Sequence, residues 1–147
     1  YVINIQGDEP LINPNDIKKT VLASKKYKNF VINCMLKIKS KMEFSSEDIP
    51  KVVFDQNFNL LFMSRSKIPF NSFNNAYKQV CIIPFRRKFL YDYSKLKPTE
   101  LEIRESIDMN RILEYGKTVK LVFSNKETYP VDTLNDLIKV RKITNKI

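Results

Sequence analysis

The sequence predicts an α/β fold with a mixed, mostly parallel sheet and flanking helices, and three observations indicate it. Apolar runs of strand length alternate with amphipathic stretches of helix length along the chain. The first run, residues 1–5, is continuous and rich in β-branched residues, which is typical of a buried strand in a parallel sheet. The chain has 147 residues, 43% of them hydrophobic, and neither a repeat nor a linker divides it. We therefore predict a single domain over residues 1–147.

The first helix is predicted to begin close to Pro14, after the turn residues that end the first strand. Asn13 is a favourable N-cap residue, and proline is favourable at the first helical position. The helix carries an apolar stripe that we expect to face the sheet, namely Ile17, Val21 and Leu22.

Strands are predicted over the middle of the chain, two of them as a hairpin. Residues 30–38 form a long apolar run. The runs 51–55 and 59–64 flank Gln56-Asn57-Phe58, which indicates a β-hairpin. Residues 66–75 are polar and aromatic and are predicted to be a loop. Residues 78–85 predict another strand, whose end is weakened by Pro84.

The last third of the chain predicts helix, strand and helix. Residues 98–104 lead into a helix over 105–115, and Gly116 is expected to end it as the C′ residue. Residues 120–123 predict the last strand. The last helix is predicted over 133–141, with Leu134, Leu137 and Ile138 on one face.

Composition excludes several kinds of chemistry and favours an anionic partner. A formal net charge of +10 favours nucleic acid, a membrane surface or a phosphate-bearing small molecule. The chain has no histidine, which excludes Ser-His-Asp, Cys-His and His-metal sites, and its two glycines leave no Walker loop. Cys34 and Cys81 are too few for a disulfide scaffold and are expected to be small core residues. We find no signal peptide and no apolar run of about 18 residues, and we expect a cytoplasmic protein with no membrane partner.

Two aspartates follow predicted strands and are candidate metal ligands. Asp8 lies in Gln6-Gly7-Asp8-Glu9-Pro10, and Asp132 lies between the last strand and the last helix. A turn at Asp8, and an N-cap at Asp132 or Thr133, are the simpler explanations when each motif is taken alone. Taken together, two aspartates at strand ends can share a Mg²⁺ ion with substrate phosphates. Arg65, at the end of the hairpin, adds a cation able to clamp a carboxylate.

At this point the sequence resembles the CMP-KDO synthetases, the 3-deoxy-manno-octulosonate cytidylyltransferases. Four segments carry the resemblance in the family's order: residues 2–12, 61–69, 115–116 and 131–137. It implies an α/β fold like that of nucleotide-diphospho-sugar transferases and a homodimer. It also implies transfer of CMP from CTP to an acidic sugar with Mg²⁺ and release of pyrophosphate, for lipopolysaccharide or capsule synthesis.

The resemblance also implies roles for individual residues. Asp8 and Asp132 match the two magnesium-binding aspartates, and Gln6 matches the glutamine beside nucleotide and sugar. Arg65 matches an arginine expected at the sugar acid, and Glu105 a glutamate placed before a helix that closes on the sugar. Asp8, Asp132 and Arg65 are thus the expected catalytic residues.

Two departures from the family pattern lie on the sugar side. The family usually has Lys-His-x-Gly where this chain has Lys78-Gln79-Val80-Cys81, so Gln79 replaces a histidine expected at the sugar. Met109 replaces a glutamine of the family's Glu-Gln-Leu-Arg. The acceptor is therefore expected to be KDO or a related 2-keto sugar acid.

A third departure concerns the nucleotide loop. The family's glycine- and arginine-rich loop would precede Tyr1, so we expect the chain to be the carboxyl-terminal part of a longer protein, lacking its amino-terminal part and binding CTP poorly by itself. Two alternatives remain at this point. One is a small basic domain that binds single-stranded nucleic acid through lysines and aromatic residues such as Phe54, Phe58 and Tyr77, although we expect no nucleic-acid partner. The other is an inactive, dimerising fragment.

Overall fold

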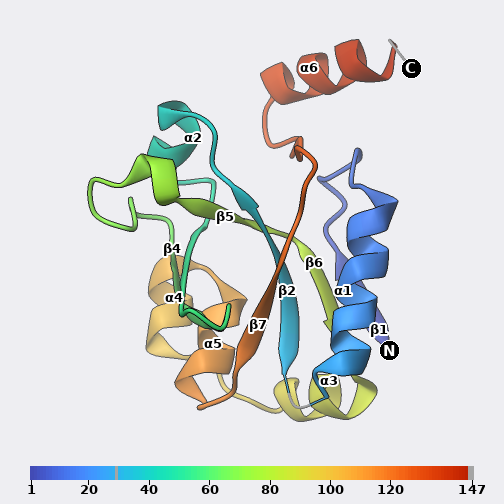
Figure 1. Cartoon of the computed structure of the whole chain (residues 1–147), viewed down its shortest axis with the longest axis vertical. Coiled ribbons are helices and arrows are strands. Elements are labelled where there is room, and N and C mark those ends of the chain that lie inside the picture. Colours follow the sequence, from blue (N-terminus) through green and yellow to red (C-terminus); the bar gives the residue numbers. More distant parts are fainter. Residues whose placement is uncertain (29, 146–147) are drawn as a thin grey trace.

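The computed structural model describes residues 1–28 and 30–145, which form two β-sheets with helices on both sides (Figure 1). The strands are β1 (Val2–Ile5), β2 (Val31–Lys37), β3 (Lys51–Phe54), β4 (Leu60–Ser64), β5 (Tyr77–Val80), β6 (Ile82–Phe85) and β7 (Val119–Phe123). The helices are α1 (Pro14–Lys26), α2 (Lys41–Ser45), α3 (Arg87–Tyr93), α4 (Glu100–Glu105), α5 (Asp108–Glu114) and α6 (Leu134–Thr144), with a 3₁₀ turn, η1 (Phe73–Asn75).

The sheets are mixed, and they are mostly antiparallel rather than mostly parallel as predicted. The larger sheet has the order β4-β3-β5-β2-β7, in which only β2 and β7 run parallel. The physical reason is connectivity: β3, β4 and β5 follow one another without a crossover helix, and short connections produce antiparallel neighbours. The hairpin at residues 56–58 is confirmed, with Phe58 in the left-handed region at φ 58°.

The first strand also differs from the prediction. The predicted strand 78–85 divides at Cys81 into β5 and β6, and β6 pairs antiparallel with β1 in a separate two-stranded sheet. β1 is largely exposed along its length instead of being buried in a parallel sheet. A continuous apolar run predicts a strand but does not specify which strand it pairs with. The prediction of a parallel, buried position for residues 1–5 was therefore wrong.

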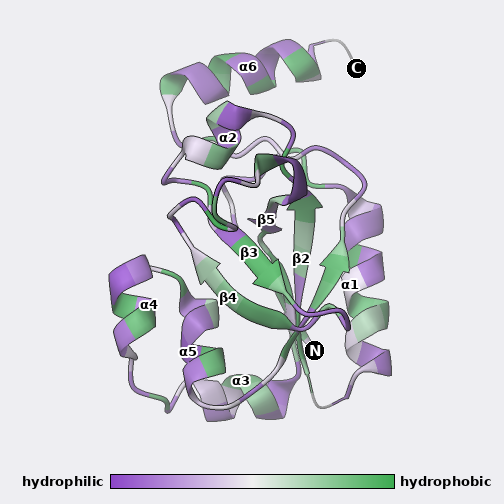
Figure 2. Cartoon of the chain, turned by 60° about the vertical axis from the view of Figure 1, so that its left-hand side comes forward, coloured by the Kyte–Doolittle hydropathy of each residue, from purple (hydrophilic) through white to green (hydrophobic). Residues whose placement is uncertain are grey.

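The core lies on both faces of the larger sheet (Figure 2). α1 packs on β2 and β6, and α5 packs on β4 and β7. The fully buried residues of α1 are polar, namely Asp16, Thr20 and Ser24. Of the predicted stripe, Ile17 packs against the core, whereas Leu22 is 56% exposed. The cost of burying Asp16 is offset by a hydrogen bond that its carboxylate accepts from the Ser124 hydroxyl at 2.6 Å.

The predicted helix 105–115 corresponds to α5, whereas Glu105 ends a separate short helix, α4, and Ser106 lies at the break between the two. Ser106 has φ 53°, in the left-handed region, and ends α4. Gly116 ends α5 as predicted, at φ 67°, with hydrogen bonds from Gly116 N to Leu113 O and from Lys117 N to Ile112 O. α6 begins at Leu134 and projects away from the sheets (Figure 1), so that Leu134 and Ile138 of its predicted apolar face are exposed.

Candidate functional site

A cavity of about 610 Å³ lies where β1, β5, the α4–α5 junction and the segment before α6 converge. Five of the six predicted site residues line it: Gln6, Asp8, Arg65, Gln79 and Asp132. Glu105 does not line the cavity, although its neighbour Ser106 does. The chain therefore brings together residues that are more than 120 positions apart in sequence.

The cavity is acidic although the chain as a whole carries a net charge of +10. Its lining includes seven acidic side chains: Asp8, Glu9, Glu43, Asp48, Asp108, Asp132 and Asp136. It includes three basic side chains: Arg65, Lys78 and Lys139. Clustered carboxylates repel one another, so this arrangement favours a bound cation.

Asp8 and Asp132 are held close together by the backbone. The N–H of Val131 donates to the carbonyl oxygen of Asp8 at 2.9 Å, which joins the loop after β1 to the segment before α6. One carboxylate oxygen of Asp8, Oδ1, is buried and has no hydrogen-bond partner among the described residues. Desolvation, followed by the charges of Asp8 and Asp136, raises the pKa of Asp132 above its ordinary value.

Glu9 is a third carboxylate of this cluster, and the sequence analysis assigned it no role. It is 8% exposed, and its Oε2 is also buried without a partner among the described residues. Burial and the neighbouring Asp8 raise the pKa of Glu9, although the charge of Lys78 opposes this effect. In the sequence, Glu9 looks like an ordinary turn residue between an aspartate and a proline. Only its burial in the structure marks it as part of the carboxylate cluster.

The donor set fits a magnesium ion that is shared with a substrate. Magnesium is usually bound by one or two carboxylates together with phosphate oxygens and water. Within residues 1–28 and 30–145, no group of three or more acidic or cysteine side chains is arranged to hold a metal ion by itself. Asp8, with its unpartnered oxygen, and Asp132 thus supply the number of protein ligands that this kind of site uses.

Thr133 is the N-cap of α6, as one of the sequence interpretations proposed. Its hydroxyl accepts from Asp136 N at 3.3 Å, and Asp136 Oδ2 in turn accepts from Thr133 N at 3.0 Å. This capping box satisfies the helix N-terminus without the side chain of Asp132. The Asp132 carboxylate therefore remains available to the cavity.

Arg65 lines the cavity, but its guanidinium is engaged by main-chain carbonyls. Nε donates to Glu105 O at 2.8 Å, and one terminal nitrogen donates to Glu47 O at 2.9 Å. Longer contacts reach the carbonyls of Asp48 and Ser106 at 3.4 Å. One N–H of the second terminal nitrogen has no partner among the described residues, so a two-point clamp on a substrate carboxylate would require at least one of these bonds to break. In this structure Arg65 ties the segment after α2 to the α4–α5 junction.

Glu105 also holds Arg65 and the end of β4 in place. Its carboxylate accepts from the Ser64 hydroxyl at 2.8 Å and from Arg65 N at 2.9 Å. Both oxygens of Glu105 thus hold the end of β4. Its predicted role at the sugar stays a prediction, and its observed contacts are those of a residue that positions Arg65.

The two positions that depart from the family pattern near β5 both line the cavity. Gln79 donates from Nε2 to Asn33 Oδ1 at 3.4 Å. Cys81 is half-buried rather than part of the core as expected, and burial raises the pKa of its thiol to about 12. A thiol with such a pKa stays protonated at neutral pH, so Cys81 contributes a small apolar wall.

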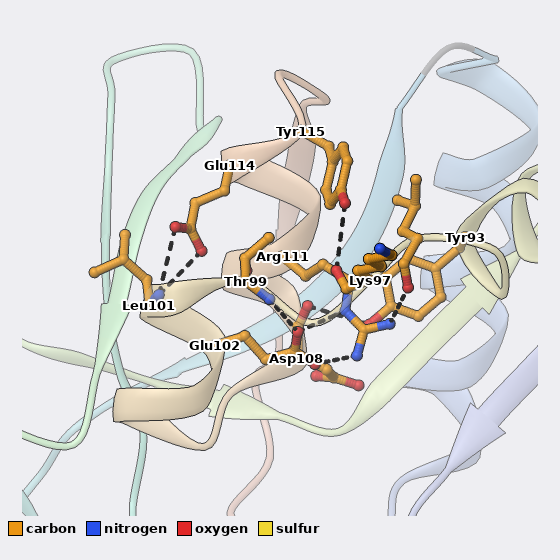
Figure 3. Close-up of polar contacts among 10 residues, drawn as sticks. Tyr93, Lys97, Thr99, Leu101, Glu102, Asp108, Arg111, Glu114 and Tyr115 are labelled. Carbon is orange, nitrogen blue, oxygen red and sulfur yellow. Dashed lines mark hydrogen bonds and ion pairs between the residues drawn. The ribbon is translucent and has the colours of Figure 1, made fainter.

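The α4–α5 junction is held rigidly behind the cavity by an ion pair (Figure 3). Arg111 donates to both carboxylate oxygens of Glu102, its Nε at 2.5 Å, and its guanidinium lies 4.8 Å from the ring centre of Tyr93. Glu102 also accepts from Thr99 N at 3.2 Å in the capping box of α4. This pair fixes the two helices that present Ser106, Ile107 and Asp108 to the cavity.

Gly7 is not required by the backbone that the structure shows. A Cβ atom built on Gly7 would meet nothing within 4 Å, and Gly7 is not among the residues of positive φ. A turn is nevertheless present at this position, because Glu9 N donates to Gln6 O at 3.3 Å across Gly7 and Asp8.

Residues 1–120 match the family model described as Cytidylyltransferase, and the chain belongs to that family. It is 35% identical over 141 residues to an 8-amino-3,8-dideoxy-manno-octulosonate cytidylyltransferase of Shewanella halifaxensis, and the match covers 92% of this chain and 58% of the relative. It is 34% identical over 158 residues to a 3-deoxy-manno-octulosonate cytidylyltransferase of Chloroherpeton thalassium, covering 99% of this chain and 62% of the relative.

Solved structures agree with this assignment. The chain superposes with a TM-score of 0.87 on a CMP:2-keto-3-deoxy-manno-octonic acid synthetase complexed with CTP, at 32% identity over 98% of this chain and 61% of that one. A candidate glucose-1-phosphate thymidylyltransferase from Bacillus anthracis, at 16% identity and a TM-score of 0.64, shares the fold. The chain thus spans about three fifths of the length of these relatives. Among the described helices, none is long and apolar enough to cross a membrane.

Proposed function

We propose that this protein transfers CMP from CTP to the anomeric hydroxyl of a 2-keto sugar acid and releases pyrophosphate. One observation carries the proposal: Asp8, with one buried carboxylate oxygen that has no partner among the described residues, is joined through the backbone to the segment of Asp132 in an acidic cavity of a basic chain. A magnesium ion shared with CTP would neutralise these charges. Membership of the cytidylyltransferase family specifies the nucleotide class.

The acceptor that we propose is KDO or its 8-amino-8-deoxy analogue. Relatives of about equal identity carry one name or the other. Gln79 and Cys81, the positions that depart from the family pattern, line the cavity, whereas Met109 is fully buried in the core. A homodimer and a place in lipopolysaccharide or capsule synthesis remain predictions.

The chain's own residues would bind and orient the two substrates. Asp8 and Asp132 would hold the magnesium ion, which supplies charge stabilisation at the phosphates and lowers the pKa of a bound hydroxyl. Gln6 and Gln79 line the cavity, and their amide groups are of a kind that would hydrogen-bond sugar hydroxyls. Orientation of the acceptor hydroxyl against the α-phosphate then needs no covalent intermediate and no histidine.

The nucleic-acid alternative loses support in the structure. Phe54 lies edge-on to Tyr77 and Phe123, with ring centres 5.2 Å and 6.2 Å apart, so these rings pack against one another instead of offering flat faces to bases. Stacking on single-stranded bases requires open ring faces.

The test is pyrophosphate release from CTP and Mg²⁺ with KDO and, separately, with 8-amino-8-deoxy-KDO. We expect release with at least one acceptor, and a loss of about 100-fold or more in kcat/KM for Asp8→Asn and Asp132→Asn, since each removes a ligand of the catalytic ion. Asp92→Asn, an exposed position on α3, is the matched control and should behave like the wild type. Full activity of Asp8→Asn would contradict the metal assignment.

A further inference from the structure

Lys78 is a buried cation in the wall of the cavity, and the proposed function above gives it no role. It lies on β5, is 4% exposed, and lines the cavity. Its ammonium donates to Glu43 Oε1 at 2.6 Å. A lysine ammonium has three N–H donors, and the described residues accept a hydrogen bond from only one of them. A buried charge with unused donors is costly unless a ligand completes its coordination.

Glu43 holds this ammonium in place from the short helix α2. Its other oxygen, Oε2, accepts from Lys39 N at 3.1 Å, and Glu43 N donates to the hydroxyl of Ser40 at 3.1 Å. Burial raises the pKa of Glu43, but the hydrogen bonds from Lys78 and Lys39 outweigh it, and the pKa lies below its ordinary value. Glu43 is thus an ionised partner that fixes the direction of the Lys78 side chain.

The other basic residues of this region differ from Lys78 either in their exposure or in having most of their donors taken by carbonyls. Arg65 is engaged by main-chain carbonyls, as described above. Lys139 lies on the exposed side of α6, with its ammonium 5.2 Å from the ring centre of Tyr129. Lys51 is opposite Lys78 in the pairing of β3 with β5 and fully buried, but its three donors are taken by the carbonyls of Ser46, Ile49 and Arg65.

The substrates of the proposed reaction carry two kinds of anion. The phosphates of CTP have the magnesium ion at Asp8 and Asp132 as a counter-charge. The carboxylate of the acceptor has no such ion and needs a cation of the protein when it is buried. Lys51 has no donor left for this task, and four of the five N–H donors of Arg65 contact main-chain carbonyls.

We propose that Lys78 binds the carboxylate of the sugar acid acceptor and that Glu43 is its positioning residue. This inference rests on the proposed function, because it assumes an acidic acceptor. It makes Lys78 the group that selects a sugar acid over a neutral sugar. Loss of one charge-assisted hydrogen bond is expected to weaken recognition by about 10- to 150-fold.

The experiment compares the acceptor acid with its neutral C1 carboxamide, both as substrates and as ligands measured by calorimetry with Mg²⁺. The wild type should prefer the acid by about 10- to 150-fold in kcat/KM. Lys78→Met should lower this preference to near one while the KM for CTP stays within about threefold. Lys37→Met, an exposed lysine on β2, is the matched control and should keep the preference. Glu43→Gln should reduce the preference without abolishing it, because Lys78 keeps its charge but loses its fixed direction.

Each outcome separates the inference from the proposed function. A higher KM for CTP in Lys78→Met, with an unchanged preference for the acid, would assign Lys78 to the triphosphate and overturn the inference. If Lys78→Met does not fold, equal binding of acid and amide by the wild type overturns it as well. Binding that depends on Lys78, without pyrophosphate release, would support the inference and overturn the proposed function.

Discussion

Lys51 is a fully buried lysine that acts through its three hydrogen bonds rather than through its charge. Burial, followed by the charge of Arg65, lowers the pKa of its ammonium, which means that the charged form is disfavoured at this position. What it contributes is the satisfaction of three carbonyls that converge under the loop after α2: Ser46, Ile49 and Arg65. Lys51 therefore fixes the loop whose residues 46–50 include four that line the cavity.

Lys51→Met is predicted to lower the free energy of unfolding by about 1–3 kcal/mol, because methionine fills the space but leaves buried carbonyls without donors. Urea unfolding at pH 7 measures this difference. Lys67→Met, at an exposed lysine in the loop after β4, makes the same chemical change and should alter stability by less than about 0.5 kcal/mol. Equal stability of the two variants would mean that water replaces the ammonium at no cost.

Site residues that belong to a local sequence motif could be predicted, and those that depend on burial could not. Asp8 and Asp132 follow strand ends, and the structure places both in the same cavity. Glu9 and Lys78 were missed because their importance lies in burial, and burial is produced by the packing of distant segments. Arg65 was found, but the carbonyls that engage it belong to residues 47–48 and 105–106, a convergence that spacing in the sequence does not encode.

Among the elements, the α4–α5 pair is built as a support for one wall of the cavity (Figure 3). Glu102 and Arg111 are largely buried, at 13% and 16% side-chain exposure, and they join two helices that are too short to be stable alone. The hydrogen bonds from Arg111 are the main cause that lowers the pKa of Glu102. The wall therefore depends on the ionisation of one carboxylate.

Glu102→Gln is predicted to destabilise the protein at pH 7 by about 2–4 kcal/mol, because it leaves a partly buried guanidinium without its counter-charge. The pH dependence has a definite sign. The folded pKa of Glu102 lies below its ordinary value of 4.5, so the stabilisation is complete above about pH 4.5 and is lost as the pH falls through the folded pKa. Denaturation midpoints of wild type and variant should converge in acid.

The exposed ion pair offers the control, because Glu100→Gln removes a partner of Arg104 at little cost. A gap between wild type and Glu102→Gln that stays constant down to pH 3 would contradict the prediction.

The elements themselves were predicted better than their pairing. Most strand positions follow from apolar runs, yet the division at Cys81 sends β6 to a different sheet from β5. A break at a single residue also changed the predicted helix, because Ser106, in the left-handed region, separates α4 from α5. Such breaks depend on tertiary contacts, here the packing of α5 against β4 and β7, and leave little trace in composition.

On the scale of the whole molecule, the cavity and the rest of the chain carry opposite charge. Seven acidic and three basic residues line the cavity, whereas the chain has 26 basic and 16 acidic residues. The exterior is therefore strongly basic and attracts anionic substrates, while the interior of the site retains cations. Repulsion within the acidic cluster is a cost to folding that a bound divalent ion removes.

Asp132→Asn is predicted to raise the melting temperature of the metal-free protein at pH 7 and to abolish its stabilisation by Mg²⁺. Desolvation and the charge of Asp8 raise the pKa of Asp132 above its ordinary value of 3.8. At pH 7 the ionised carboxylate therefore lowers the stability of the folded state. The neutral amide of asparagine removes that cost. In the wild type, Mg²⁺ at about ten times its dissociation constant should add about 1.4 kcal/mol, or roughly 2–5 °C. Thermal unfolding with and without Mg²⁺ measures both effects, with Asp92→Asn as the control. Protonation neutralises Asp132 as the pH falls through its raised pKa. The metal-free wild type and Asp132→Asn should therefore become equally stable in acid. A difference in stability that persists in acid would show that the carboxylate is not the source of the cost.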